Sequence, residues 1–177
     1  MKGDKRPLSH VYNLNRLGQA GDEVTIEACE AERGELARFA DVPRVDGFLG
    51  RVSLKKLSPN RFKLDFQLTA DIVQACVVSL ADVPAHIERR FARELHFQPP
   101  LRRPPDQPAA PEISLEEDVP EENDSLHYDL AAPLIEEFVL AIDPYPRAPG
   151  VAFQPPGEGE EAPQTPFAIL KGLKSGL

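Results

Sequence analysis

The longest regular pattern in the chain is an alternation of apolar and polar residues that begins at Arg61 and runs on toward Leu80. Apolar side chains occupy every second position of its first two-thirds: Phe62, Leu64, Phe66, Leu68, Ala70 and Ile72. Because successive side chains of a strand point to opposite faces, this period of two predicts a strand with one face on a core and one in water. Strands of that length usually bend, and bent strands belong to strongly twisted sheets or barrels.

Shorter alternating segments predict further strands before it. Residues 24–28 form one of them, and residues 48–55 alternate in the same manner up to the turn Ser58-Pro59-Asn60. Residues 8–14 are more polar but are also expected to form an opening strand. Because turn residues separate two alternating runs, residues 48–55 and the long strand are expected to form a β-hairpin.

Residues 84–97 are compatible with two structures. They fit a strand if Arg89 and Arg93 are tolerated on its apolar face. They also fit a helix, because Ile87, Phe91 and Leu95 are spaced by four residues and would share one side of it. The position directly after a long strand and a short turn favours the strand.

Two helices are predicted by a change of period. In residues 31–39, Leu36 and Phe39 share an apolar side that continues to Ala40, and Asp41-Val42-Pro43 ends the helix. Asp129 is expected to be the N-cap of a second helix, Leu130–Ile142, with Pro133 near its first turn. The apolar stripe of this second helix comprises Leu134, Ile135, Phe138, Ala141 and Ile142.

These elements predict an α+β fold: a strongly bent antiparallel β-sheet, either open or closed into a barrel, with one short helix in each half of the chain. Residues 1–97 are expected to form the β-rich core, and residues 98–123 a disordered, proline-rich, acidic linker. Residues 124–150 would carry the second helix and an Asp-Pro-Tyr-Pro-Arg segment that pack back on the core. Residues 151–177 would be a flexible tail that ends in an amphipathic peptide.

Charge divides the 177 residues unevenly. Residues 1–105 hold 17 basic and 14 acidic residues, whereas residues 106–177 hold 3 and 15. The predicted core is therefore mildly basic and the rest strongly acidic. An acidic tail of this kind can compete with a polyanion for a basic face.

Catalytic and metal-binding patterns are absent from the sequence. The histidines lack metal-ligand spacing, and no glycine-rich phosphate loop or nucleophile elbow occurs. Two cysteines are too few for a disulfide scaffold or a closed zinc site, and Cys76 is most simply a buried small apolar residue. We therefore expect no enzyme, no cofactor and no metal. Because no apolar stretch is as long as that of a signal peptide or a membrane span, we expect a cytoplasmic protein without membrane contact.

The predicted hairpin carries the functional signal that has a mechanism. Basic residues lie on or near its two arms: Arg51, Lys55, Lys56, Arg61 and Lys63. Cations across two paired strands can follow a phosphate backbone, although an ordinary solvated sheet face has a similar composition. Since no aromatic residue lies among them, backbone or shape contacts with RNA are expected rather than base stacking.

The terminal peptide is a second candidate contact. Phe167, Leu170 and Leu173 form an apolar set that fits a partner's groove, or equally a frayed end.

Three stretches in this order resemble one family. They are Gln74-Ala-Cys-Val-Val-Ser-Leu80 after the long strand, Leu140-Ala-Ile-Asp-Pro-Tyr-Pro-Arg147 after the second helix, and Thr165-Pro-Phe-Ala-Ile-Leu-Lys-Gly-Leu-Lys174. Together they are similar to the bacterial YceD-like family, the large-ribosomal-RNA-subunit accumulation proteins, which have chloroplast relatives. Many relatives carry Cys-x-x-Cys where this chain has Cys76 and Ser79, so a structural metal of those relatives would not carry over.

The resemblance implies a non-enzymatic ribosome-biogenesis factor that promotes accumulation or maturation of large-subunit ribosomal RNA. Its expected partner is that RNA or a pre-ribosomal particle, contacted through the basic hairpin. The alternative is an acidic adaptor whose segment 106–123 holds a basic ribosomal protein during assembly. The oligomeric state is left open.

Overall fold

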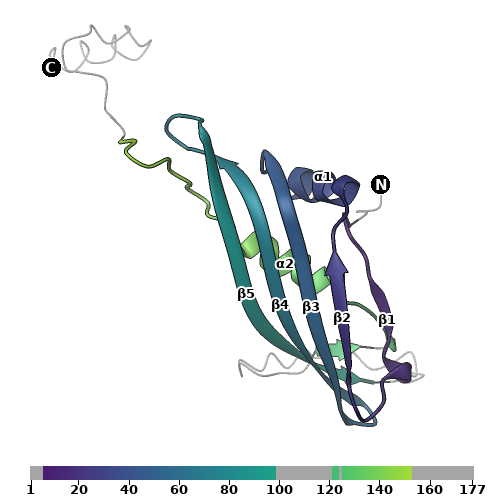
Figure 1. Cartoon of the computed structure of the whole chain (residues 1–177). Coiled ribbons are helices and arrows are strands. Elements are labelled where there is room, and N and C mark those ends of the chain that lie inside the picture. Colours follow the sequence, from purple (N-terminus) through teal and green to yellow (C-terminus); the bar gives the residue numbers. More distant parts are fainter. Residues whose placement is uncertain (1–5, 99–120, 124, 153–177) are drawn as a thin grey trace, which may run out of the picture.

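The computed structural model describes residues 6–98, 121–123 and 125–152 (Figure 1). A five-stranded sheet has the order β2-β3-β4-β5-β6, and β1 pairs with β7 in a separate two-stranded sheet. The helices are α1 (Glu30–Phe39) and α2 (Ala131–Ala141), and a 3-10 turn spans Leu14–Arg16. The strands are β1 (Val11–Asn13), β2 (Asp22–Glu27), β3 (Arg44–Ser58), β4 (Arg61–Ala75), β5 (Asp82–Phe97), β6 (Glu121–Asn123) and β7 (His127–Asp129).

The alternation along β4 separates the two faces of the sheet as predicted. Its apolar positions are buried, and they lie opposite buried positions of β3, as in the pairs Val52–Phe66 and Leu54–Leu64. The predicted hairpin of β3 and β4 and the strand interpretation of residues 84–97 are therefore confirmed. β4 ends at Ala75, and Cys76 begins the turn that leads into β5 at Asp82.

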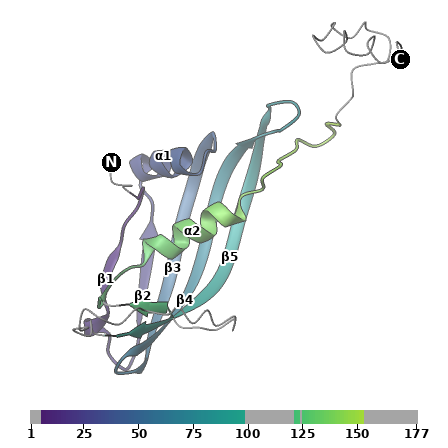
Figure 2. The same ribbon diagram turned by 180° about the vertical axis from the view of Figure 1, so that it is seen from behind.

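Helix α2 lies across the inner face of the sheet, as Figure 2 shows. Leu134 of α2 packs directly on Gly50 of β3, where a Cβ would overlap its methyl groups. Phe138 meets Phe48 edge-on, with ring centroids 5.5 Å apart. The glycine thus lets the helix approach the sheet closely enough to share one apolar core with it.

Arg89 and Arg93 do lie on the inner face of β5, and α2 explains why they are tolerated there. Nη2 of Arg93 is 2.7 Å from Oε2 of Glu136, and Nε of Arg89 is 3.9 Å from Oε1 of Glu137. The two glutamates of α2 thus pair with these cations, while Glu136 stays largely exposed to solvent and Glu137 is half-buried.

The sheet does not close into a barrel within the described part of the chain. Its strand order ends at β2 on one side and at β6 on the other. β6 corrects the linker prediction, because residues 121–123 form a strand parallel to β5. Glu121 is held there by the hydroxyl of Tyr128 at 3.2 Å and by Arg93 at 3.6 Å. The remaining linker and tail predictions, residues 99–120 and 153–177, lie outside the described residues.

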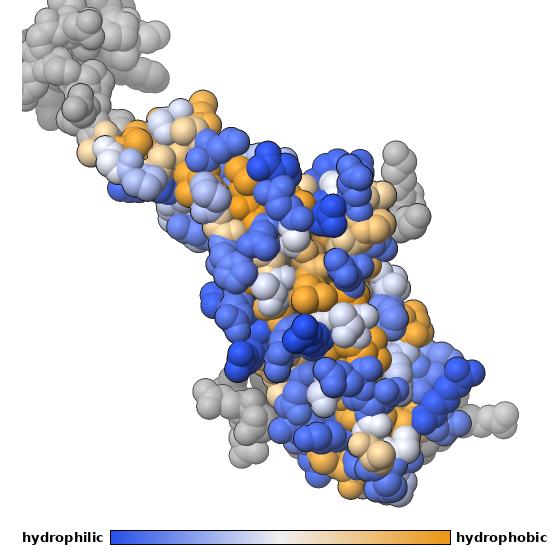
Figure 3. All heavy atoms as spheres, viewed as in Figure 1, coloured by the Kyte–Doolittle hydropathy of each residue, from blue (hydrophilic) through white to orange (hydrophobic). Residues whose placement is uncertain are grey.

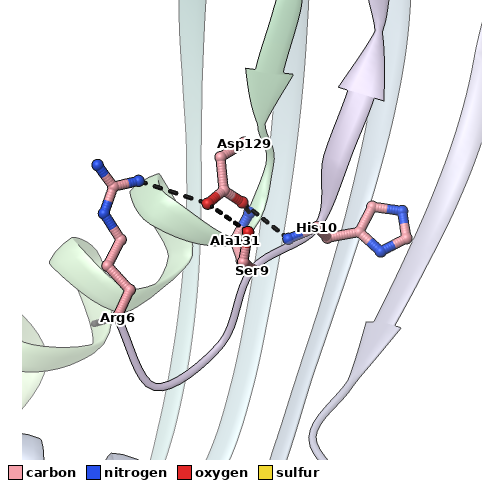
Figure 4. A network of polar contacts seen from close by, with 5 residues as sticks. All are labelled: Arg6, Ser9, His10, Asp129 and Ala131. Atoms are coloured by element: carbon pink, nitrogen blue, oxygen red, sulfur yellow. Dashed lines mark hydrogen bonds and ion pairs between the residues drawn. The ribbon is translucent and has the colours of Figure 1, made fainter.

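The prediction that Asp129 is the N-cap of the second helix is wrong by one residue, because Asp129 ends β7, but its carboxylate still contacts the start of α2 (Figure 4). Leu130 occupies the N-cap position, and Oδ1 of Asp129 accepts the N–H of Ala131 at 3.1 Å. The same carboxylate accepts the backbone N–H of His10 at 2.8 Å and the hydroxyl of Ser9 at 2.9 Å. Asp129 thereby joins the N-terminal segment to the start of α2.

The expected apolar side of the first helix is partly wrong. Leu36 and Ala37 are buried against the core, whereas Phe39 is 48% exposed. The helix is rotated so that Leu36, rather than the phenylalanine, faces the core.

Candidate nucleic-acid interface

Four of the five predicted cations, Lys55, Lys56, Arg61 and Lys63, lie around the turn between β3 and β4, whereas Arg51 lies at the middle of β3, opposite Gln67. Alternation along the strands places Arg51, Lys55, Arg61 and Lys63 on the outer face of the sheet, which α2 does not cover. Lys56 lies on the opposite face, in register with Phe62, and its Nζ is 6.0 Å from the centre of that ring. The structure therefore brings four of the five onto one surface.

Two of these cations face each other directly. Lys55 and Lys63 are Cα partners in the β3–β4 ladder, on the same face of the sheet. Like charges at opposed positions repel and destabilise a strand pair. Asp65, with Oδ1 3.5 Å from Nζ of Lys63, offsets part of this repulsion. An anion seated between the two ammonium groups would offset more of it.

Acidic neighbours neutralise part of the site. Nη2 of Arg61 is 2.7 Å from Oε2 of Glu94 on β5. By contrast, Arg51 and Lys55 are exposed and form no ion pair with any described residue. These two carry the charge most readily available to a ligand.

The register of β3, β4 and β5 places a further cation, Arg90, in line with Arg51 across the sheet. Arg51 lies opposite Gln67 on β4, and Gln67 lies opposite Arg90 on β5. Nη2 of Arg90 is 3.1 Å from Oε1 of Glu88, and both side chains are exposed. The sequence could not show that Arg90 lies in line with Arg51, because this depends on the register between β4 and β5.

The outer face as a whole carries both signs of charge. Figure 3 shows hydrophilic residues over most of this view, with apolar atoms showing between them. Glu23 on β2 lies in the same row as Ser53 and Asp65, beside the basic end. A ligand that tracks the hairpin therefore meets a basic end rather than a uniformly basic sheet.

Cys76 lies at the other end of β4 and is fully buried, as expected. The N–H groups of Ser79 and Ala148 point at its Sγ from 3.4 and 3.3 Å. A hydrogen bond from the Ser79 side chain, followed by these N–H groups, lowers the pKa of the Cys76 thiol to about 6, although burial raises it. Because the sulfur has no contact with solvent, it serves here as an acceptor that holds two loops together.

The described residues contain no group of three His, Cys, Asp or Glu side chains placed to hold a metal ion. Neither described helix is long and apolar enough to span a membrane. The predicted partner contacts Phe167, Leu170 and Leu173 lie outside the described residues.

Comparison with known proteins identifies the family. A family model described as "Large ribosomal RNA subunit accumulation protein YceD" matches residues 64–174, more than half of the 177 residues. No curated protein and no solved structure matches the chain. The chain therefore belongs to the YceD family, as its resemblance indicated. The matched range begins one residue after Lys63, so it does not bear on the five cations of the hairpin.

Proposed function

We propose that this member of the YceD family promotes accumulation or maturation of large-subunit ribosomal RNA by binding RNA phosphates at the basic end of β3 and β4. The description of the family supports the connection with large-subunit ribosomal RNA. The protein would act in the cytoplasm as a binding factor without catalysis of its own. Its ligand would be the RNA itself or an assembling particle.

The observation that carries this proposal is the opposition of Lys55 and Lys63. Their cross-strand pairing concentrates positive charge at a cost to the stability of the sheet. A phosphate between two ammonium groups converts that repulsion into attraction, and it releases counterions from the RNA. Arg51, without an ion-pair partner among the described residues, lies four residues before Lys55 on the same face of β3, so it would extend the site by about 13 Å toward the middle of the sheet.

The chemistry of the site favours backbone contacts over base reading. Lysine and arginine side chains on a sheet reach phosphate oxygens, whereas sequence-specific RNA recognition needs splayed bases stacked on aromatic rings or arginine planes. Phe62 lies between Arg61 and Lys63 in the sequence, but its ring is buried on the inner face of the sheet and cannot stack on a base. Binding should therefore depend strongly on salt and weakly on sequence.

A salt series with a purified large-subunit ribosomal RNA fragment tests the proposal. For the wild-type chain, the logarithm of the association constant should fall linearly with the logarithm of salt concentration. The triple variant Arg51→Ser, Lys55→Ser, Lys63→Ser should bind at least tenfold more weakly at low salt. Its slope should be shallower by about 2, as expected for the loss of about three phosphate contacts at roughly 0.7 each.

A matched variant removes the same charge elsewhere. Arg33→Ser, Arg38→Ser, Arg44→Ser takes three cations from α1 and the start of β3, at the opposite end of the sheet. This control should keep the wild-type slope. Equal slopes for both triple variants would refute the assignment of the site, and an absence of binding at low salt would show that the RNA effect is indirect.

The adaptor alternative and the terminal peptide stay predictions. Deletion of residues 106–120, which spares β6, should abolish capture of a basic ribosomal protein if the acidic segment is the contact. Tighter RNA binding after the same deletion would instead identify that segment as a competitor for the basic face. Replacement of Phe167, Leu170 and Leu173 by serine tests the peptide through loss of a partner.

A further inference from the structure

We propose that the end of the molecule opposite the basic hairpin is a docking surface for a basic protein segment. Two parts of the chain form it: the turn between β4 and β5, residues 76–82, and the segment 143–148 that follows α2. We call this the apolar end. The proposal is independent of RNA binding at the basic hairpin.

Three large apolar side chains are presented to solvent there. Leu80 is 78% exposed, Tyr145 is 72% exposed and Val77 is 47% exposed. The two parts of the surface are adjacent, because the N–H of Val77 donates to the carbonyl of Pro146 at 2.9 Å, and Leu80 belongs to the same turn, in which its N–H donates to the carbonyl of Cys76 at 2.9 Å. Exposed apolar residues scattered singly are ordinary, but a cluster that includes a tyrosine is typical of interaction sites.

Gln74 and Cys76 anchor the backbone of the segment that carries Tyr145. Nε2 of Gln74, whose side chain is buried, donates to the carbonyl of Asp143 at 2.7 Å. The N–H of Ala148 points at Sγ of Cys76, and Pro146 is buried between these two anchors. The backbone is therefore fixed on both sides of Tyr145 while its ring projects outward. A rigid aromatic anchor loses little conformational entropy when it binds.

The backbone conformation of Leu80 is a second, independent indication that this surface binds a partner. Its φ is +60°, in the left-handed region that a branched, apolar residue rarely adopts. Asparagine or glycine would occupy this position with less strain, and neither would expose an aliphatic side chain. Strained backbone that presents an apolar group to solvent is more common at functional sites than in ordinary turns.

The charged residues beside these apolar side chains indicate which kind of partner would bind. Asp82 and Asp143 flank the apolar side chains, and neither forms an ion pair among the described residues. Arg44, whose pKa is raised by Asp46 and to a smaller extent by Asp82, is already paired with Asp46 at 2.6 Å. Arg147 is an exposed cation of the same segment. Oδ1 of Asp143 also accepts the N–H of Tyr145 at 2.9 Å, which fixes this carboxylate beside the tyrosine. Two carboxylates without an ion pair beside apolar side chains fit a partner that offers lysine or arginine next to apolar side chains, and they disfavour a phosphate backbone.

A photo-crosslinking experiment on the full chain tests this surface. Tyr145 is replaced by the photoreactive analogue p-benzoylphenylalanine, and the protein is irradiated with RNA-free total protein extracted from large ribosomal subunits. A single defined basic protein should dominate the crosslinked products identified by mass spectrometry. The yield should fall at least fivefold when salt is raised, because the flanking carboxylates contribute to binding.

Leu80→Asn separates binding from folding. Asparagine adopts the left-handed conformation more readily than leucine, so the thermal midpoint should stay the same or rise. The crosslinking yield should nevertheless drop at least fivefold. Val11→Ser, which removes a comparably exposed aliphatic residue (60%) from β1, should leave the yield unchanged.

Each other occupant gives its own result, and each overturns the proposal. Crosslinks between two copies of the chain would identify a self-association face. A parallel reaction with the ribosomal RNA fragment that crosslinks at position 145 while the protein fraction does not would identify a nucleic-acid site. Crosslinks that spread evenly over many proteins, that survive Leu80→Asn, or that do not form at all would show that the apolar end is not a docking surface.

Discussion

At the scale of single residues, Tyr12 and Asp22 connect two strands that belong to different sheets. The Tyr12 hydroxyl donates to Oδ2 of Asp22 at 2.6 Å. Burial, followed by the hydrogen bond to this carboxylate, raises the pKa of Tyr12 to about 12. The same hydrogen bond lowers the pKa of Asp22. Both shifts mean that the folded state favours a protonated phenol beside an ionised carboxylate.

This pair should make stability fall at alkaline pH. Because the pKa of Tyr12 is higher in the folded chain than in the unfolded one, its contribution is complete below about pH 10. The contribution is lost as pH rises from there toward 12. Tyr12→Phe should lower the urea midpoint at pH 7 and flatten its decline between pH 9 and 11. A decline as steep in Tyr12→Phe as in the wild type would show that other groups cause it.

Of the carboxylates in the described part of the chain, the half-buried Asp129 should cost the most stability when it is removed. Its oxygens accept hydrogen bonds from Ser9, His10 and Ala131. Loss of a helix-start acceptor alone costs about 1 kcal/mol, and each further hydrogen bond about as much. We expect Asp129→Ala to lower the free energy of unfolding by about 2–3 kcal/mol in urea titrations.

Two comparisons make the Asp129 result specific. Asp129→Asn keeps one acceptor oxygen and should lose about half as much stability. Glu35→Ala removes an exposed carboxylate of α1 and should change the free energy of unfolding by less than about 0.5 kcal/mol. Equal losses for Asp129→Ala and Glu35→Ala would contradict the role of the network.

The sequence located Asp129 at the start of a helix, but it could not show this network. Helix starts have a local signature, because a short polar side chain precedes a run with helical period. The partners of Asp129 at Ser9 and His10 lie 120 and 119 residues away along the chain. No local pattern encodes such a contact. The opposition of Lys55 and Lys63 was missed for a related reason, since it depends on the register of a hairpin rather than on its existence.

At the scale of elements, the contact between α2 and β3 depends on a missing side chain. Gly50 has no Cβ, and Leu134 of α2 fills the space that a Cβ would take. Neither residue is unusual in sequence, and a glycine in a strand is ordinarily a weakness. Here the glycine permits the helix to cover the sheet.

Gly50→Ala should therefore destabilise the fold although alanine is the better strand residue. Overpacking of a well-packed core typically costs about 1–3 kcal/mol, and we expect a loss in that range from chemical denaturation. Leu134→Ala alone should also destabilise, by about 2–4 kcal/mol, because it leaves a cavity. In the double variant the two losses should be less than additive, since the new methyl group occupies part of that cavity. Strict additivity would mean that the two side chains do not compete for the same space.

Element prediction succeeded where one face of an element is apolar and failed where an element is defined by its partner. The long strands were recognisable because a period of two persists through them. β6 is three residues long and has no apolar pattern, so its pairing with β5 had no signal in the sequence. Arg89 and Arg93 made β5 ambiguous for the same reason, because the glutamates that balance them lie on a helix more than 40 residues later.

At the scale of the whole molecule, β4 separates two ends of different character. Its 15 residues correspond to roughly 45–50 Å at the usual rise of about 3.3 Å per residue. The opposed pair of Lys55 and Lys63 lies at its beginning, Arg51 lies opposite its middle, and the apolar end lies at its finish, so the sheet keeps the lysine pair and the apolar end apart (Figure 1). At that separation, exposed charges on one end are screened from the other by several Debye lengths at physiological salt.

The proposed sites should therefore be independent of each other. Leu80→Asn should leave the RNA affinity and its salt slope within twofold of the wild-type values. Conversely, the Arg51, Lys55, Lys63 triple serine variant should keep the crosslinking yield at position 145. Adding the RNA fragment to the crosslinking reaction should not displace the protein partner, because neither ligand reaches the other site. If RNA instead suppressed the crosslink in the wild type and failed to do so in the triple variant, the two sites would be coupled, and a single ligand spanning the length of β4 would explain both.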